Sequence, residues 1–150
     1  MAHALRAGGD SNAEMSRIAY RAGYRYQLHE AYCVQIPIRP PEPIFHEYIT
    51  LATDGRLCIS SGYCWDGSSG ALDTNSAMRG SLLHDAGYQL LRLELLPEDT
   101  REAWDALYRD ICLEDGMWPI RALLHFDALR LFGQPAADPK NDKPVLYAPG

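Results

Sequence analysis

Residues 76–116 read SAMRGSLLHDAGYQLLRLELLPEDTREAWDALYRDICLEDG, and the order of the structural elements follows from this stretch. Its apolar residues recur every three or four positions on both sides of Pro97, which is the pattern of two amphipathic helices. We expect the first helix over about residues 76–93 and the second over about residues 97–115, with Gly116 as its stop signal. Because the connection is short, the two helices are predicted to pack antiparallel as a helical hairpin.

Upstream of this pair the apolar spacing changes to a period of two. Residues 24–38 place apolar side chains at nearly every even position, which predicts a long strand with one face on the core. The charged Glu30 interrupts this pattern, so a strand broken near Glu30 is the alternative. The prolines within residues 39–43 lack backbone donors and end that strand. Residues 45–51 alternate again, and an Asp-Gly dipeptide then favours a tight hairpin turn before a return strand over residues 56–60.

A third helix is predicted to begin at Pro119 and to end at Gly133. Strands come first and helices afterwards, so the expected class is α+β, with a small antiparallel sheet packed on the helical hairpin and the third helix. The predicted organisation is a flexible N-terminal arm over residues 1–16, a single globular domain over residues 17–133 and an extended, proline-rich tail over residues 134–150.

The composition is that of an ordinary globular chain. Its 150 residues and 16.8 kDa suit one domain, and 47% of the residues are hydrophobic. The formal charge of -6 repels phosphate backbones and argues against nucleic-acid binding. No apolar run approaches the roughly twenty residues of a membrane-spanning helix, and the N-terminus lacks the apolar core of a secretory signal. We therefore expect no transmembrane segment and no Sec-type export.

The four cysteines, Cys33, Cys58, Cys64 and Cys112, are widely spread and form no Cys-x-x-Cys pair. This usage favours reduced core thiols over a disulfide framework or a zinc site, and hence a reducing compartment. A bridge between Cys58 and Cys64 is the alternative, because a hairpin strand and the loop after it could bring these two residues together.

The first predicted helix carries His84, Asp85 and Tyr88, which combine an imidazole, a carboxylate and a phenol. Neighbouring helix residues point about 100° apart, so His84 and Asp85 must serve different partners. Folding the second helix back antiparallel places Tyr108 opposite His84 and Asp105 one turn away. We predict that Asp105 bonds Nδ1 of His84 and orients it as a general base, with Tyr88 and Tyr108 in support.

The segment before this helix is a glycine-rich loop over residues 62–70. Asp85 is predicted to point towards the loop, whose carbonyl groups are hard oxygen ligands of the kind that calcium prefers. A cation there would polarise a substrate carbonyl and stabilise an oxyanion. Calcium is the expected cofactor, and its predicted ligands are Asp85, Asp66, Gly67 and Ser69.

The His-Asp-x-x-Tyr helix, the Asp on the next helix and the glycine-rich loop resemble the catalytic layout of the calcium-dependent secreted phospholipase superfamily. The resemblance covers about residues 62–112. It implies that His84 activates a water, that Asp85 binds calcium together with the loop carbonyls, and that Asp105 orients His84. The implied substrate carries an ester or related acyl bond.

Over about residues 49–117 the chain also resembles a family of uncharacterised proteins encoded by tailed phages and prophages. The shared motifs are a Gly-aromatic-x-x-Asp-x-x-Ser loop, a His-Asp-x-x-Tyr helix and an Arg-x-x-x-Asp helix. Here they are Gly62, Tyr63, Asp66, Ser69, His84, Asp85, Tyr88, Arg101 and Asp105. This resemblance implies a phage origin, and with it a place in the host cytoplasm or on the virion.

Each candidate side chain also has a purely structural interpretation. His84 would be a core histidine bonded to a carbonyl group. Asp105 would join Arg101 and Arg109 in an ion-pair ladder on the helix surface. The loop would be an Ω-loop whose Trp65 fills a gap in the core.

Three further histidines, His29, His46 and His125, have no partners at ligand spacing and are expected to be ordinary surface or strand residues. Two functions of different classes stay open. One is a small phage-encoded hydrolase that acts on an unidentified ester-type substrate. The other is a non-catalytic phage protein, either a virion component or an accessory factor that binds a phage or host protein, in which the same residues only hold the fold together.

Overall fold

The computed structural model describes residue 18, residues 20–21, residues 26–67 and residues 74–141. The predicted N-terminal arm over residues 1–16 and the last part of the predicted tail lie outside this range. Short strands occupy the first part of the described chain and helices the second. The predicted α+β class is therefore confirmed.

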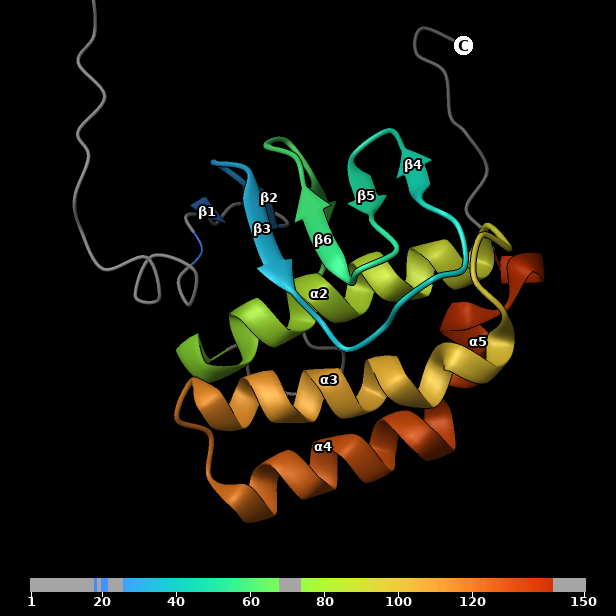
Figure 1. Ribbon diagram of the computed structural model, residues 1–150. Helices are drawn as coiled ribbons and strands as arrows, with labels where there is room; N and C mark the ends of the chain where they lie inside the picture. The colour runs from blue at the N-terminus through green and yellow to red at the C-terminus, as the bar shows by residue number, and fades with distance from the viewer. Residues whose placement is uncertain (1–17, 19, 22–25, 68–73, 142–150) are drawn as a thin grey trace, which may run out of the picture.

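The strands form two antiparallel sheets (Figure 1). The larger sheet has the order β3-β6-β5-β4 and consists of β3 (Tyr32–Gln35), β4 (Ile44–His46), β5 (Ile49–Leu51) and β6 (Arg56–Ile59). The smaller sheet has the order β1-β2-β7 and consists of β1 (Tyr20–Arg21), β2 (Tyr26–Leu28) and β7 (Cys64–Trp65). Buried positions alternate along β3 and β6, so one face of the larger sheet meets the core.

The predicted long strand over residues 24–38 is two strands that belong to different sheets. β2 pairs with β7, whereas β3 pairs with β6, and the chain bends at residues 29–30 between them. The buried residues Leu28, Tyr32 and Val34 keep the period of two across the bend. The spacing therefore identified the buried face, and the predicted break near Glu30 is confirmed. The change of sheet at this break was not predicted.

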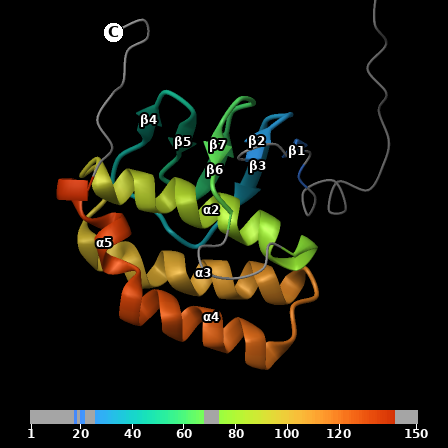
Figure 2. The ribbon, with the colours of Figure 1, turned by 180° about the vertical axis from the view of Figure 1, so that it is seen from behind.

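The helices are α2 (Asn75–Arg92), α3 (Arg101–Glu114), α4 (Pro119–Phe132) and α5 (Gln134–Ala137), with short 3-10 turns η1 (Glu98–Thr100) and η2 (Pro139–Asn141). Figures 1 and 2 show α2 across one face of the larger sheet, α3 beside α2, and α4 on the side of α3 that is away from the sheet. The predicted helical hairpin and third helix are confirmed. Within the described residues, no helix has both the length and the apolar character needed to cross a membrane.

Two of the four cysteines form a disulfide, so the prediction of reduced thiols is wrong for them. Cys33 on β3 and Cys58 on β6 are direct partners in the sheet register, and their Cα atoms lie 4.1 Å apart. Antiparallel pairing brings the side chains of such cross-strand partners close together. Cys64 is an exposed thiol and Cys112 a buried one, so the alternative bridge between Cys58 and Cys64 is also wrong.

The first part of the predicted tail is helical and not extended. Residues 134–137 form α5, whose Ala137 is buried in the core. Arg92, in the last turn of α2, donates a 2.8 Å hydrogen bond from Nη1 to the carbonyl oxygen of Ala136. Because this bond satisfies a carbonyl group that the short helix leaves open, it holds α5 against the end of α2. The packed part of the chain therefore extends past Gly133.

Candidate functional site

His84 and Asp105 face each other across the helical hairpin. His84 lies midway along α2 and Asp105 in the first half of α3, and Nε2 of His84 lies 2.8 Å from Oδ1 of Asp105. The predicted contact is confirmed, but it uses Nε2 and not Nδ1. Nε2 is the ring nitrogen farther from Cβ, so it is the one that reaches across the gap between two helices. Asp105 is fully buried, whereas the side chain of His84 keeps 9% of its surface exposed.

The carboxylate of Asp105 has further partners. Tyr88 donates from its hydroxyl to Oδ1 at 2.6 Å, and Arg130 of α4 donates from Nη1 to Oδ2 at 2.8 Å. Arg101, one turn before Asp105, lies 3.6 Å from Oδ2 and donates to the Tyr88 hydroxyl at 3.3 Å. We refer to His84, Tyr88, Arg101, Asp105 and Arg130 as the Asp105 junction. It ties α2, α3 and α4 together.

The sequence identified most of this junction but missed Arg130. The position of α4 against α3 depends on tertiary packing, and a basic residue in the last turn of a helix has an ordinary explanation at the helix terminus. The structural alternative of a surface ladder is wrong, because Asp105 is buried and Arg109 pairs with Asp110 at 2.8 Å. The other structural alternative named a carbonyl group as the partner of a core histidine. It is wrong about the partner, because His84 contacts the carboxylate of Asp105.

The surroundings keep His84 neutral and Asp105 ionised at neutral pH. Burial lowers the pKa of His84 below its ordinary value and outweighs the opposing hydrogen bond with Asp105. Burial raises the pKa of Asp105, but the hydrogen bonds from His84, Tyr88 and Arg130 outweigh it, so the net shift is downward. A neutral imidazole beside a carboxylate donates through Nε2 and keeps its lone pair on Nδ1. Among the described residues, none forms a hydrogen bond with Nδ1.

Tyr108 contacts His84 through its ring. The two rings meet edge to face, with centroids 5.6 Å apart. The Tyr108 hydroxyl lies 2.8 Å from Nδ1 of His125 on α4, and these two rings stack with centroids 5.9 Å apart. The prediction that His125 is an ordinary surface residue is therefore wrong. Burial and the charge of Arg121 lower the pKa of His125.

The described part of the glycine-rich loop, residues 62–67, packs on α2 as predicted. Trp65 is 3% exposed and donates from Nε1 to the hydroxyl of Ser81 at 3.0 Å. Asp66 donates its backbone N–H to Oδ2 of Asp85 at 3.4 Å. Asp85 thus faces the loop while its neighbour in the motif faces α3, which is the division of partners that the helix geometry requires.

The predicted calcium ligands lie only partly within the described residues. Asp66 and Asp85 are in contact, Gly67 follows with a φ of 79°, and Ser69 lies outside the described residues. Among the described residues, no group of three or more His, Cys, Asp or Glu side chains could hold a metal ion. The hydrogen bond from Asp66 brings the carboxylate of Asp85 to the backbone of the loop, and carboxylate and carbonyl oxygens are the kind of donors that calcium prefers.

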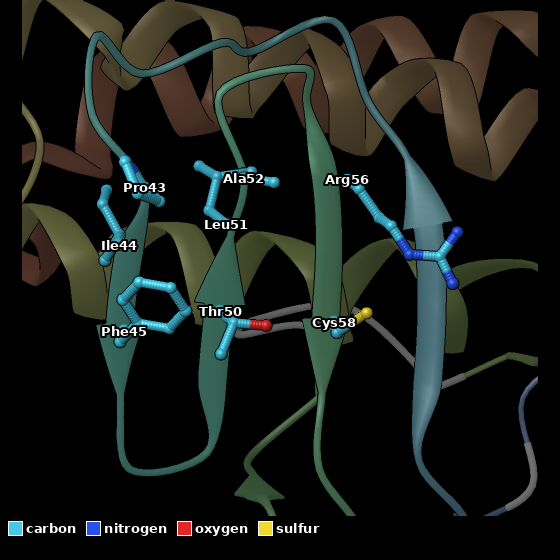
Figure 3. A pocket seen from close by; sticks show the side chains of 8 residues that line it. All are labelled: Pro43, Ile44, Phe45, Thr50, Leu51, Ala52, Arg56 and Cys58. Atoms are coloured by element: carbon cyan, nitrogen blue, oxygen red, sulfur yellow. The ribbon is translucent and has the colours of Figure 1, made fainter.

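A hollow on the outer face of the larger sheet is separate from this site. Figure 3 shows it on the side of the sheet that faces away from the helices. It is lined by Pro43, Ile44, Phe45, Thr50, Leu51, Ala52, Arg56 and Cys58. None of these residues belongs to the Asp105 junction or to the glycine-rich loop.

No family model, curated protein or solved structure matches this chain. The phospholipase-like and phage-like resemblances therefore stay predictions. The Asp105 junction and the contact between Asp85 and the loop are the features of the structure that bear on function.

Proposed function

We propose that this protein is a small phage-encoded hydrolase that uses His84 as a general base against an ester or related acyl bond. The observation that carries the proposal is the 2.8 Å contact between Nε2 of His84 and Oδ1 of Asp105. This contact favours the tautomer in which Nδ1 carries the lone pair. That is the form in which an imidazole accepts a proton from an attacking water.

The rest of the junction prepares His84 for this step. Asp105 orients the ring and stabilises the positive charge that develops when Nδ1 takes the proton. Tyr88 and Arg130 hold the carboxylate of Asp105 in place, and the charge of Arg130 favours its ionised form. Because burial lowers the pKa of His84, the ring is neutral and able to accept a proton at neutral pH.

Calcium is the proposed cofactor, with Asp85, Asp66, Gly67 and Ser69 as its ligands. When bound, it would supply positive charge for the oxyanion that forms as the acyl bond is attacked. Asp85 directly follows His84 on α2 and accepts a hydrogen bond from the backbone of Asp66, which supports a cation site adjacent to the base.

Hydrolysis of 4-nitrophenyl esters and of phospholipid vesicles, with and without calcium, tests this proposal. We expect His84→Gln to lower kcat by about a thousandfold and Asp105→Asn to lower it by about a hundredfold or more. His29→Gln, an exposed histidine outside the site, is the matched control and should keep full activity. A wild-type protein that hydrolyses none of these esters in calcium would contradict the proposal.

Burial favours one alternative function. The side chain of His84 is 9% exposed, and both oxygens of Asp105 already have partners on other helices. A buried polar network of this kind also serves to fix a unique packing arrangement. The alternative is a non-catalytic phage protein, a virion component or an accessory host-interaction factor, in which the junction only aligns the helices.

Calcium separates the two functions. A cation that binds only the native state adds about 2.7 kcal/mol of stability at about one hundred times its Kd, and Asp85→Asn should remove most of the resulting rise in Tm. Under the alternative, calcium leaves the Tm unchanged. Asp85→Asn is then itself destabilising by about 1–3 kcal/mol, because it weakens the acceptor for the backbone of Asp66.

A further inference from the structure

Helix α4 turns an apolar face away from the rest of the protein. Six large side chains on it or directly before it are 52% to 78% exposed: Trp118, Ile120, Leu123, Leu124, Leu131 and Phe132. We refer to these six residues as the α4 face. Asp127 is the one charged side chain among the exposed residues of α4, a helix that lies wholly within the described chain. Figures 1 and 2 show α4 at the outer edge of the helical layer.

The α4 face is larger than the apolar patches of ordinary monomers. With about 150–250 Å² for a fully exposed large side chain, the observed exposures amount to about 700 Å² of apolar surface. The largest apolar patch on a typical monomer covers about 300–600 Å². A stable protein–protein interface buries about 800 Å² on each partner, which is close to the exposed apolar area of the α4 face.

We propose that the α4 face is the interface of a homodimer in which α4 packs antiparallel against α4 of a second copy. Ile120, Leu124, Asp127 and Leu131 follow one another at spacings of four, three and four residues, which is the seam spacing of paired helices. A two-fold axis near the middle of α4 sets Ile120 of one copy opposite Leu131 of the other. The same arrangement sets Asp127 beside Leu124, so the two Asp127 carboxylates do not meet.

The packing of α4 within one copy also indicates a second copy as the occupant. Ala122 is the one buried residue of α4, a helix that lies entirely within the described chain, and Leu129 packs partly buried beside it. The larger apolar side chains on the other side of the helix have little cover from their own protomer. A membrane surface fits the face less well, because the chain has a charge of -6 and Asp127 lies within the face. The interface would bury the apolar side of a helix that contributes Arg130 and His125 to the interior.

Sedimentation velocity on the full chain tests the proposal. The Cys64→Ser background is used so that the exposed thiol cannot link two copies. We expect a mass of twice 16.8 kDa at about 100 µM, and at least about a hundredfold increase in Kd for the double variant Leu124→Asp with Leu131→Asp. Amide hydrogen exchange in wild-type α4 should slow as the protein concentration rises, a measurement that needs no change in the face.

Phe132→Asp and Phe45→Asp are the matched pair, because both phenylalanines are 78% exposed, one on α4 and one on β4. Only Phe132→Asp should weaken the dimer.

A wild-type monomer at every concentration would overturn the proposal, and so would a dimer that survives the double aspartate variant. A monomer that dimerises only after removal of residues 142–150 would assign the face to the chain's own last residues. Flotation of the monomer with neutral vesicles would assign it to a membrane, and either result also overturns the proposal.

Discussion

The Asp105 junction and the α4 face reverse the usual distribution of polar and apolar groups. At the junction, a fully buried carboxylate and two arginines lie between three helices. On the outer side of α4, six large apolar side chains are exposed. Within one copy, α4 is held by the polar bonds of Arg130 and His125 to α3 and by the packing of Ala122 and Leu129. Its exposed side adds little contact within the protomer, so substitutions in the two regions should differ strongly in their effect on stability.

The largest expected effect is at Asp105. Asp105→Ala leaves Arg130, Tyr88 and His84 without their acceptor in a buried site, and we expect a loss of about 3–5 kcal/mol in the free energy of unfolding. Urea unfolding of the wild type and the variant measures this difference in free energy.

Asp127→Ala, which replaces an exposed aspartate on α4, is the matched control. At a protein concentration well below the dimer Kd it should change the free energy of unfolding by less than about 0.5 kcal/mol. Equal losses for Asp105→Ala and Asp127→Ala would show that the buried junction contributes no more to stability than the exposed side of α4 does.

The sequence predicted the core of the candidate site because that part depends on local geometry. A short connection between two amphipathic helices makes them antiparallel, and the position of Asp105 relative to His84 then follows from the number of residues to the turn. The alternation of buried positions along β3 and β6 is equally local. Both predictions needed only the periods of the helix and the strand.

What the sequence missed depends on contacts between distant segments. The bridge from Cys33 to Cys58 requires β3 to pair with β6, and no hairpin turn joins these two strands. Arg130 and His125 reach their partners only once α4 is placed against α3. The pattern of α4 does not choose its inner face, because apolar residues lie on most sides of that helix.

A smaller effect is expected at Gly87, where α2 and α3 approach closely. A Cβ atom at Gly87 would overlap the ring of Trp104, which is fully buried. Gly87→Ala should therefore cost about 1–3 kcal/mol through overpacking, and it should also separate His84 from Asp105. Urea unfolding gives the first quantity, and the NMR shift of the His84 ring reports the second.

Adding Trp104→Phe to Gly87→Ala should recover part of the loss, because the smaller ring makes room for the methyl group. If Gly87→Ala alone were neutral, the close approach of α2 and α3 would not be what brings His84 to Asp105.

The pH dependence of stability sharpens the contrast further. Burial lowers the pKa of His84, so the unfolded chain takes up a proton at a higher pH than the native state does. The contribution of His84 to the free energy of unfolding is complete above the ordinary histidine pKa of about 6.5. It is lost as the pH falls below that value, and the free energy of unfolding then falls by at most about 1.4 kcal/mol per pH unit. The pKa of Asp105 is also lowered, so its protonation at more acidic pH causes a further loss of stability.

Urea unfolding between pH 7 and pH 5 measures this slope, because pH 5 lies about one and a half units below the ordinary pKa of histidine. His84→Gln should make this slope shallower. A part of the slope should remain because burial also lowers the pKa of His125. A steeper slope in His84→Gln than in the wild type would contradict the sign of the shift.

The smallest effect is expected on the α4 face itself. Leu124 is 62% exposed, so replacing it with Gln removes little apolar contact within one copy. At a protein concentration well below the dimer Kd, Leu124→Gln should change the free energy of unfolding by less than about 0.5 kcal/mol. At high concentration the wild type should gain stability from association and the variant should not, because ligation by a second copy stabilises only the folded state. A loss above about 2 kcal/mol in the dilute variant would mean that Leu124 is buried within one copy, and the contrast with the Asp105 junction would then fail at its exposed end.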